Sequence, residues 1–406
     1  MYIIILIRIN AVGMKRWLSS LKTIHLLHIS RITGVPQRGP KPCLARRIER
    51  AILQCQLPGV YLDTRNNGVH NNTRANADDT RMSILSVDMG VQNLGIAHFE
   101  VLSSSNDVVN NNVKPILDAW YRIRVSDIDV SNDANVGLDL DSTFCQEGER
   151  SKKAAEETTQ QDDTAAKNKK KKGQRKKDTL PFTAPAYAAR AYRVLNSLLE
   201  KHQPTHVLIE RQRFRSGGSA AVQEWTLRVG MFEAMLHATL HTYRKRELLR
   251  LSESHDDAKP PVVAPLVFAV EPQRIVKYWR LVMGSSVFEE GTKDALGGRP
   301  SPEKLSPADV KKAHVNLVAK WLLDLADGDD KANDAHMRVS GNKEMREMVH
   351  AYLDRHRGIK KTEAKSVDKL DDLADCVLQG VAWWEWQVNK YRIARDGLDL
   401  DGELEV

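Results

Sequence analysis

Two short apolar segments of the chain each end in a single acidic residue. Residues 84–87 are followed by Asp88, and residues 207–209 are followed by Glu210. A lone acid at the end of a strand is more often a helix cap or a solvated charge. Functional groups of α/β proteins nevertheless gather at strand ends. Two such segments in one chain therefore indicate that both carboxylates serve one site.

A third acidic group lies near the C-terminus, in the segment KLDDLADCVLQG at 369–380. Asp371 and Asp375 are four residues apart, and Asp372 and Asp375 are three apart, so either pair would share one face of a helix. Like charges at these spacings destabilise a helix unless a cation bridges them. Alternatively, Asp371 and Asp372 complement the positive helix N-terminus, which leaves Asp375 unexplained.

Carboxylate oxygens are hard ligands that suit Mg²⁺ or Mn²⁺. A pair of such ions activates water and stabilises the leaving oxygen of a phosphodiester. The sequence contains no GxxxxGK[ST] motif, so a P-loop ATPase is disfavoured. No clear Ser/His/Asp or Cys/His arrangement indicates nucleophilic catalysis instead. Metal-dependent phosphodiester hydrolysis is the chemistry that these acids predict, provided that the fold brings them together.

Basic residues surround the same segments. The chain has a net charge of +8 and a pI near 9.1, which is consistent with an anionic partner. The run KNKKKKGQRKK at 167–177 is typical of a solvated linker, with DNA contact or a nuclear-type address as alternatives. We expect the DNA-facing residues to be Arg211, Gln212, Arg213, Arg215, Lys277, Lys311 and Lys312. An ion pair with Glu210 or a solvated helix face would explain the same cations without DNA.

Hydrophobic periodicity predicts an α/β domain over residues 83–390. Apolar runs predict strands at 84–91, 95–101, 116–125, 205–210 and 262–270. Helical spacing recurs at 185–201, 220–246, 307–325 and 371–389. A meander of three strands followed by alternating helices and strands indicates a mixed five-stranded sheet flanked by helices. We expect polar insertions at 126–184 and 326–365 and an acidic tail at 391–406.

The N-terminal part has a different composition. The first 50 residues hold one acid, Glu49, among many basic residues, which suits a mitochondrial transit peptide, and residues 1–16 are a possible targeting segment. Residues 17–57 have the outline of a SAP-like DNA-binding motif, although a transit peptide plus linker would look similar. Residues 58–82 are predicted to be a linker. The four cysteines form no CxxC pair, and no apolar run reaches the ~18 residues of a membrane helix.

Three motifs carry a resemblance to a known family. DMGVQNLGIA at 88–97, IERQRFRSGG at 209–218 and KLDDLADCVLQG at 369–380 resemble the fungal mitochondrial Holliday junction resolvases, over roughly residues 82–390. The resemblance implies an RNase H-like fold of the retroviral integrase superfamily. It also implies Mg²⁺-dependent cleavage of four-way DNA junctions in mitochondria by a homodimer. Many fungal members carry an N-terminal SAP-like segment.

The resemblance also assigns roles to the acids. Asp88 matches the metal-binding aspartate of the first strand, and Glu210 matches the glutamate of the IERQ motif. Asp375, with Asp371 or Asp372, matches the carboxylates of the last helix. We expect Asp88, Glu210, Asp371 and Asp375 to bind Mg²⁺ (or Mn²⁺), with Asp372 nearby and Lys369 neutralising charge on the phosphate. A nuclease acting on RNA–DNA hybrids and a non-catalytic junction-binding protein remain the alternatives.

Overall fold

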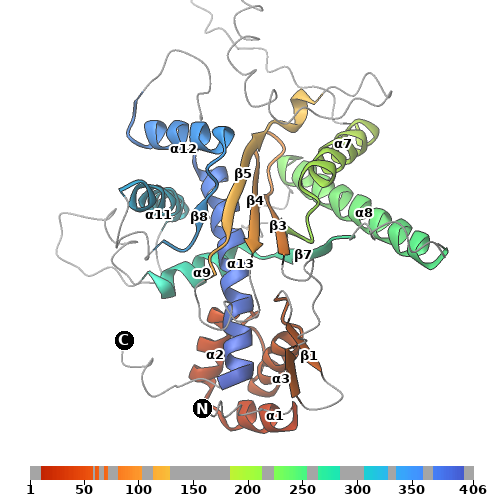
Figure 1. Cartoon of the computed structure of the whole chain (residues 1–406), viewed down its shortest axis with the longest axis vertical. Helices are drawn as coiled ribbons and strands as arrows, with labels where there is room; N and C mark the ends of the chain where they lie inside the picture. Colours follow the sequence, from red (N-terminus) through yellow and green to blue (C-terminus); the bar gives the residue numbers. More distant parts are fainter. Residues whose placement is uncertain are drawn as a thin grey trace, which may run out of the picture.

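A six-stranded mixed sheet runs through the centre of the computed structural model (Figure 1). The structure describes residues 11–57, 60–63, 68–71, 81–102, 113–128, 183–212, 224–253, 264–283, 306–327, 335–359 and 369–396. The strands are β3 (Arg81–Asp88), β4 (Leu94–Leu102), β5 (Ile116–Ile123), β6 (His206–Glu210), β7 (Leu266–Val270) and β8 (Arg338–Val339). Their order across the sheet is β7-β6-β3-β4-β5-β8.

The sheet topology places three strand ends side by side. Strands β3, β4 and β5 form an antiparallel meander, in which Asp88 pairs with Gly95. Strand β6 is parallel to β3, and β7 is parallel to β6. The carboxyl ends of β3, β6 and β7 therefore lie at one edge of the sheet. The predicted mixed sheet and its five strands are confirmed, and β8 is a sixth strand that is too short to leave a periodic pattern.

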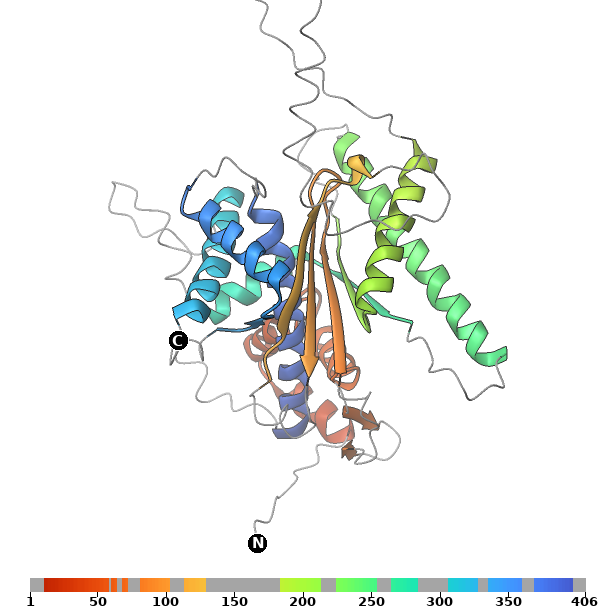
Figure 2. The same ribbon diagram turned by 45° about the horizontal axis from the view of Figure 1, so that its top comes forward.

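Helices cover both faces of the sheet, as Figure 2 shows with the sheet seen nearly edge-on. One face carries α7 (Ala184–His202) and α8 (Glu224–Glu253). The other carries α9 (Pro272–Val282), α11 (Pro307–Asp327), α12 (Lys343–His356) and α13 (Asp371–Asp396). Trp384 and Trp386 of α13 are buried, as expected for core residues. None of the described helices has the length and apolar character needed to cross a membrane.

Two predicted boundaries are corrected by the structure. The range 326–365, expected to be a polar insertion, contains β8 and α12. Few residues of α12 contact the core, chiefly Met345, Met348 and Tyr352, and many of the others are charged. The helical periodicity of apolar residues is therefore weak in this range. The expected tail at 391–406 begins later, because α13 continues to Asp396. Most of the range 126–184 lies outside the described residues.

The N-terminal segment forms three helices: α1 (Ala11–Ser20), α2 (Thr23–Ile32) and α3 (Lys41–Leu53). They share a hydrophobic cluster with Ile393 and Ala394, so they pack on the C-terminal end of α13. The predicted SAP-like range 17–57 begins inside α1, and a break after Ser20 separates α1 from α2. Residues 1–10 of the expected targeting segment lie outside the described residues. The expected linker at 58–82 contains a hairpin of β1 (Val60–Asp63) and β2 (Gly68–Asn71).

His206, the first residue of β6, is a buried titratable group in the sheet. Its ring lies 6.0 Å from Phe268 and 5.2 Å from Trp383, between centroids. Burial lowers the pKa of His206 to about 4, from the ordinary 6.5. Between these pH values the unfolded chain binds a proton that the folded protein does not, so stability is lost as the pH falls below about 6.5.

We predict that replacing His206 with Phe, which keeps an aromatic ring in this stack, flattens the acid side of the stability curve. The free energy of unfolding of the wild type should fall between pH 6.5 and 5 by up to roughly 1.4 kcal/mol more per pH unit than that of the variant. Urea denaturation across this range measures the difference. The exposed His350 provides the control: His350→Phe should keep the wild-type slope, and an unchanged slope in His206→Phe would contradict the assignment.

Candidate active site

The ends of β3 and β6 bring Asp88 and Glu210 together. The two strands pair directly, with Val87 opposite Ile209. Asp88 is 9% exposed and forms a hydrogen bond with Glu210, whose Oε2 also accepts the backbone N–H of Met89 at 3.1 Å. Burial, followed by the charge of Glu210, raises the pKa of Asp88 well above its ordinary value. Burial and the neighbouring charges also raise the pKa of Glu210, so both carboxyl groups resist ionisation here.

The first turn of α13 adds the helix carboxylates to this pair. A Cβ atom placed on Gly95 would lie 2.3 Å from the carbonyl oxygen of Asp372, so only glycine permits this approach of helix to strand. Asp375 and Asp372 both raise the pKa of Asp88 through their charges. The structure thus places two acids of α13, Asp372 and Asp375, near the two acids of the strand ends.

Asp371 and Asp372 differ in their surroundings. Asp371 accepts a hydrogen bond from Lys311 at 2.5 Å, and this contact lowers its pKa although burial acts in the opposite direction. Asp372 has a buried Oδ2 atom without a hydrogen-bond partner. Burial and then the charge of Asp371 raise the pKa of Asp372 to about 6. Of the two neighbours, Asp372 is the one whose carboxylate lacks a partner.

Helix α11 supplies a second layer of contacts to the helix acids. His314 is buried, and its Nδ1 lies 2.5 Å from Oδ1 of Asp375, while its Nε2 is buried without a partner. Lys311 and His314 are three residues apart and so share one face of α11. Sequence reasoning placed Lys311 on a DNA-binding surface and missed His314 altogether. A single histidine in an apolar helix gives no signal that distinguishes this contact from ordinary packing.

The remaining predicted residues divide between the site and its surroundings. The side-chain amide of Gln212 donates to Oε2 of Glu210 at 3.2 Å, and its backbone N–H donates to Glu233 of α8 at 3.0 Å. Arg211 lies 3.6 Å from Glu271, in an ion pair away from Glu210. Lys369 is exposed just before α13, where its charge acts on both Asp371 and Asp372.

The four other predicted DNA contacts lie away from the acids or outside the described residues. Lys277 on α9 donates to Gln37 of the N-terminal segment at 2.9 Å. Lys312 is exposed on α11. Arg213 and Arg215 lie outside the described residues.

The four acids are near one another without being in contact as a ligand set. Within the described ranges, three possible ligand atoms lie within 4.8 Å of one another only at His98, Asp118 and His202. That group is a hydrogen-bonded network beside the end of α7, with His98 bonded to Ser83 at 2.8 Å and His202 to Tyr121 at 3.1 Å. The carboxylates around Asp88 would have to draw closer together to share one ion.

A family model, a curated protein and a solved structure are similar to this chain. A family model described as mitochondrial resolvase Ydc2 / RNA splicing MRS1 matches residues 84–393. The curated protein "Cruciform cutting endonuclease 1, mitochondrial" of Schizosaccharomyces pombe is 28% identical over 209 residues. That match covers 52% of this chain and 61% of the relative, so the chain spans less than two thirds of the relative's length. The crystal structure of the yeast mitochondrial Holliday junction resolvase Ydc2 is 20% identical, with a TM-score of 0.47 over 93% of this chain and 99% of that one.

We predict that Gly95→Ala destabilises the protein, because the added methyl group would force the first turn of α13 away from β4. Overpacking of this kind costs about 1–3 kcal/mol of the free energy of unfolding. Gly230 in α8 is the matched control, since a Cβ there meets nothing within 4 Å. Chemical denaturation of Gly230→Ala should show equal or greater stability than the wild type, and equal stability of both variants would refute the close approach at Gly95.

Proposed function

The chain belongs to the family described as mitochondrial resolvase Ydc2 / RNA splicing MRS1, and from this premise we propose that it is a metal-dependent endonuclease that resolves four-way (Holliday) DNA junctions in mitochondria. The observation that carries the proposal is the group of carboxylates at the ends of β3 and β6 and the start of α13, of which Asp88 is buried and the others are half-buried. Membership in a family of resolvases implies the use of a divalent metal ion. The mitochondrial location is supported by the names of the family and of the curated relative.

The proposed ligands are Asp88, Glu210, Asp372 and Asp375, and the proposed ion is Mg²⁺ or Mn²⁺. The fit is supported by the raised pKa of Asp88 and by the buried, unpartnered oxygen of Asp372. Such an ion supplies Lewis-acid stabilisation of phosphate charge and a water of lowered pKa. From the sequence we expected Asp371 as the fourth ligand, and its contact with Lys311 favours Asp372 instead.

The protein's own residues hold the carboxylates in orientation. Met89 N–H and Gln212 both donate to Oε2 of Glu210, which restricts rotation of that carboxylate. His314 holds Oδ1 of Asp375 and leaves the other oxygen of that carboxylate for a ligand. Hydrogen bonds of this kind from outside the ligand set fix ligand geometry and tune affinity.

Two cations flank the acids on the solvent side. Lys311 pairs with Asp371, and Lys369 lies immediately before α13; both side chains are exposed. In that position their ammonium groups attract a DNA phosphate and neutralise charge that develops on it. Two opposed cuts in a two-fold symmetric junction require two such sites, which a C₂ homodimer supplies.

Two alternatives to a junction resolvase differ from it in catalysis or in substrate. The family description also names RNA splicing, so a non-catalytic nucleic-acid-binding protein is the second candidate, and a nuclease acting on RNA–DNA hybrids is the third. Clustered, partly buried carboxylates reduce stability, and a protein that only binds nucleic acid does not need them. The presence of all four acids at one edge of the sheet therefore favours catalysis.

We predict that Asp88→Asn abolishes nicking of a synthetic four-way junction in Mg²⁺ and leaves junction binding intact. The asparagine keeps the size of the side chain and removes the charge that would hold the ion. Gel assays with labelled junction, linear duplex and RNA–DNA hybrid separate the three candidates. Binding by the wild type without nicking of any substrate would support the second candidate, and preferential cutting of the hybrid would support the third.

A second prediction separates the adjacent aspartates. Asp372→Asn should lower the nicking rate at least about 100-fold and remove the rise in melting temperature that Mg²⁺ or Mn²⁺ causes in the wild type. Asp371→Asn, which breaks only the contact with Lys311, should lower the rate by roughly 10-fold and keep the thermal shift. The reverse pattern would make Asp371 the ligand.

A further inference from the structure

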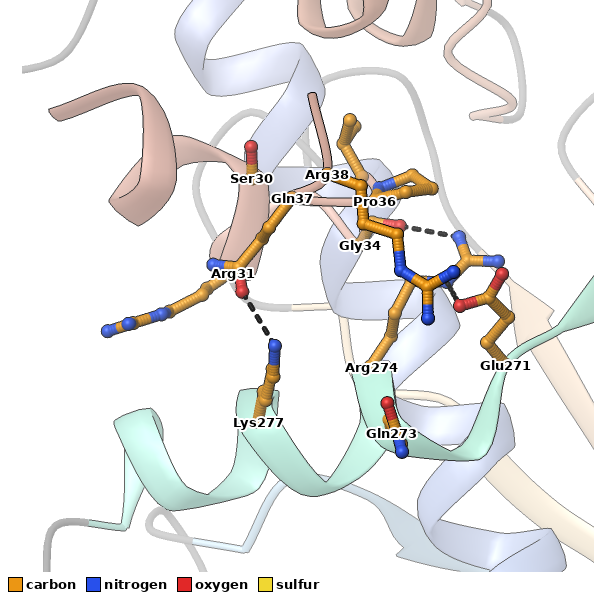
Figure 3. Close-up of a pocket in the computed structure, with 11 residues that line it drawn as sticks. Ser30, Arg31, Gly34, Pro36, Gln37, Arg38, Glu271, Gln273, Arg274 and Lys277 are labelled. Carbon is orange, nitrogen blue, oxygen red and sulfur yellow. Dashed lines mark hydrogen bonds and ion pairs between the residues drawn. The ribbon is translucent and has the colours of Figure 1, made fainter. Parts of the chain in front are cut away.

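A small basic cavity lies between the N-terminal helices and α9 (Figure 3). It has a volume of about 60 Å³. Its walls are the segment that joins α2 to α3 and the first two turns of α9. The lining residues that matter below are Arg31, Gln37, Arg38, Glu271, Arg274 and Lys277.

The walls of this cavity are held by specific contacts. Arg274 Nη1 donates to the carbonyl oxygen of Gly34 at 2.7 Å, and Arg47 Nη1 donates to that of Arg38 at 2.9 Å. Gly34 has a φ of +67°, and a Cβ atom there would lie 2.1 Å from the ring of Trp386. The segment between α2 and α3 therefore sits against α13 and α9 in one conformation. A preformed site of this kind binds its ligand without first having to order the chain.

The charge and size of the cavity select a small anion. Four residues with cationic side chains, Arg31, Arg38, Arg274 and Lys277, line the cavity together with one carboxylate residue, Glu271. That carboxylate already lies 3.6 Å from Arg211 and 3.9 Å from Arg274. Among the described residues, neither Arg31 nor Arg38 forms an ion pair, so positive charge is in excess. The volume is far below the roughly 300 Å³ at which pockets for small molecules begin, so the cavity suits a single phosphate group.

The cavity is connected to the proposed active site through the sheet. Glu210 pairs with Val270, and Glu271, which follows Val270, begins the cavity wall. The ends of β7 and β3 are two strand positions apart, which is roughly 10 Å. A DNA strand covers that distance in roughly three nucleotides. The ion pair of Arg211 with Glu271 links the residue after Glu210 to the cavity.

We propose that this cavity binds a backbone phosphate of the DNA substrate, a few nucleotides from the phosphate that is cut. The proposal rests on the proposed function, because it takes the nuclease's substrate as its ligand. Contacts to phosphates fix the register of a protein on DNA without reading its sequence. Arg38 and Lys277 are the phosphate donors, while Arg274 and Arg47 hold the walls.

The test is the binding of a four-way junction by Arg38→Ala/Lys277→Ala in Ca²⁺, an ion chosen to suppress cleavage. Both side chains are exposed, so folding should be unaffected. We expect affinity at about 100 mM salt to fall roughly 10-fold and the slope of log K against log salt to become shallower by about 1, the effect of losing one phosphate contact. The control is Arg346→Ala/Lys343→Ala, two exposed cations of α12 at the opposite edge of the sheet. An equal change in both variants would overturn the proposal.

A second measurement locates the contact on the DNA. Junctions carrying one neutral methylphosphonate at successive positions should lose wild-type affinity at one position a few nucleotides from the cut. The Arg38→Ala/Lys277→Ala variant should be insensitive at that position alone, and sensitivity equal to that of the wild type at every position would overturn the proposal. Because both measurements record binding, they remain decisive if nicking is never observed, and that result would count against the proposed function only.

Discussion

Repulsion among carboxylates is the constraint around which the edge of the sheet is arranged. Asp88, Glu210, Asp372 and Asp375 come from three separate elements, and burial makes the charges of the first three costly. The protein offsets part of this cost through the hydrogen bond between Asp88 and Glu210 and by placing the positive end of α13 next to the strand ends. His314 and Lys311 on α11 take up two further carboxylate oxygens. What remains is the unpartnered oxygen of Asp372, which a divalent cation would satisfy.

Helix α13 links this edge to the rest of the molecule. Its first turn lies on Gly95 of β4, and Gln379, two turns later, donates to Ser86 and to the carbonyl of Val87. Its last turns pack on the N-terminal helices through Ile393 and Ala394. The helix is buried along most of its length. The acids at one end and the N-terminal helices at the other are therefore held by a single element.

The charge distribution follows the same division. Negative charge is concentrated and partly buried at the ends of β3 and β6, whereas cations lie on the surface around it, at Lys311 and Lys369 and in the basic cavity beside α9. Surface cations draw the phosphate backbone towards the protein at long range. The buried acids act only at short range, where an ion bridges them to a phosphate. This separation allows a nuclease with a site rich in carboxylates to bind a polyanion.

The sequence by itself determined the class of the fold and the residue types of the site. Two local patterns do not depend on the tertiary structure. They are the apolar runs that end in Asp88 and Glu210, and the spacing of Asp371, Asp372 and Asp375. The same holds for the burial of the tryptophans of α13 and for the five longer strands. These features depend on the periodicity of apolar residues, which can be read directly from the sequence.

Only the tertiary structure decided which neighbours those residues meet. The different surroundings of Asp371 and Asp372 arise from Lys311, sixty residues earlier on another helix. The contact of His314 and the cavity beside α9 depend on how helices pack against one another, and the packing of β8 and α12 depends on contacts made by a few methionines and one tyrosine. Such contacts join residues that are distant in the chain, so the spacing of residues along the sequence does not predict them.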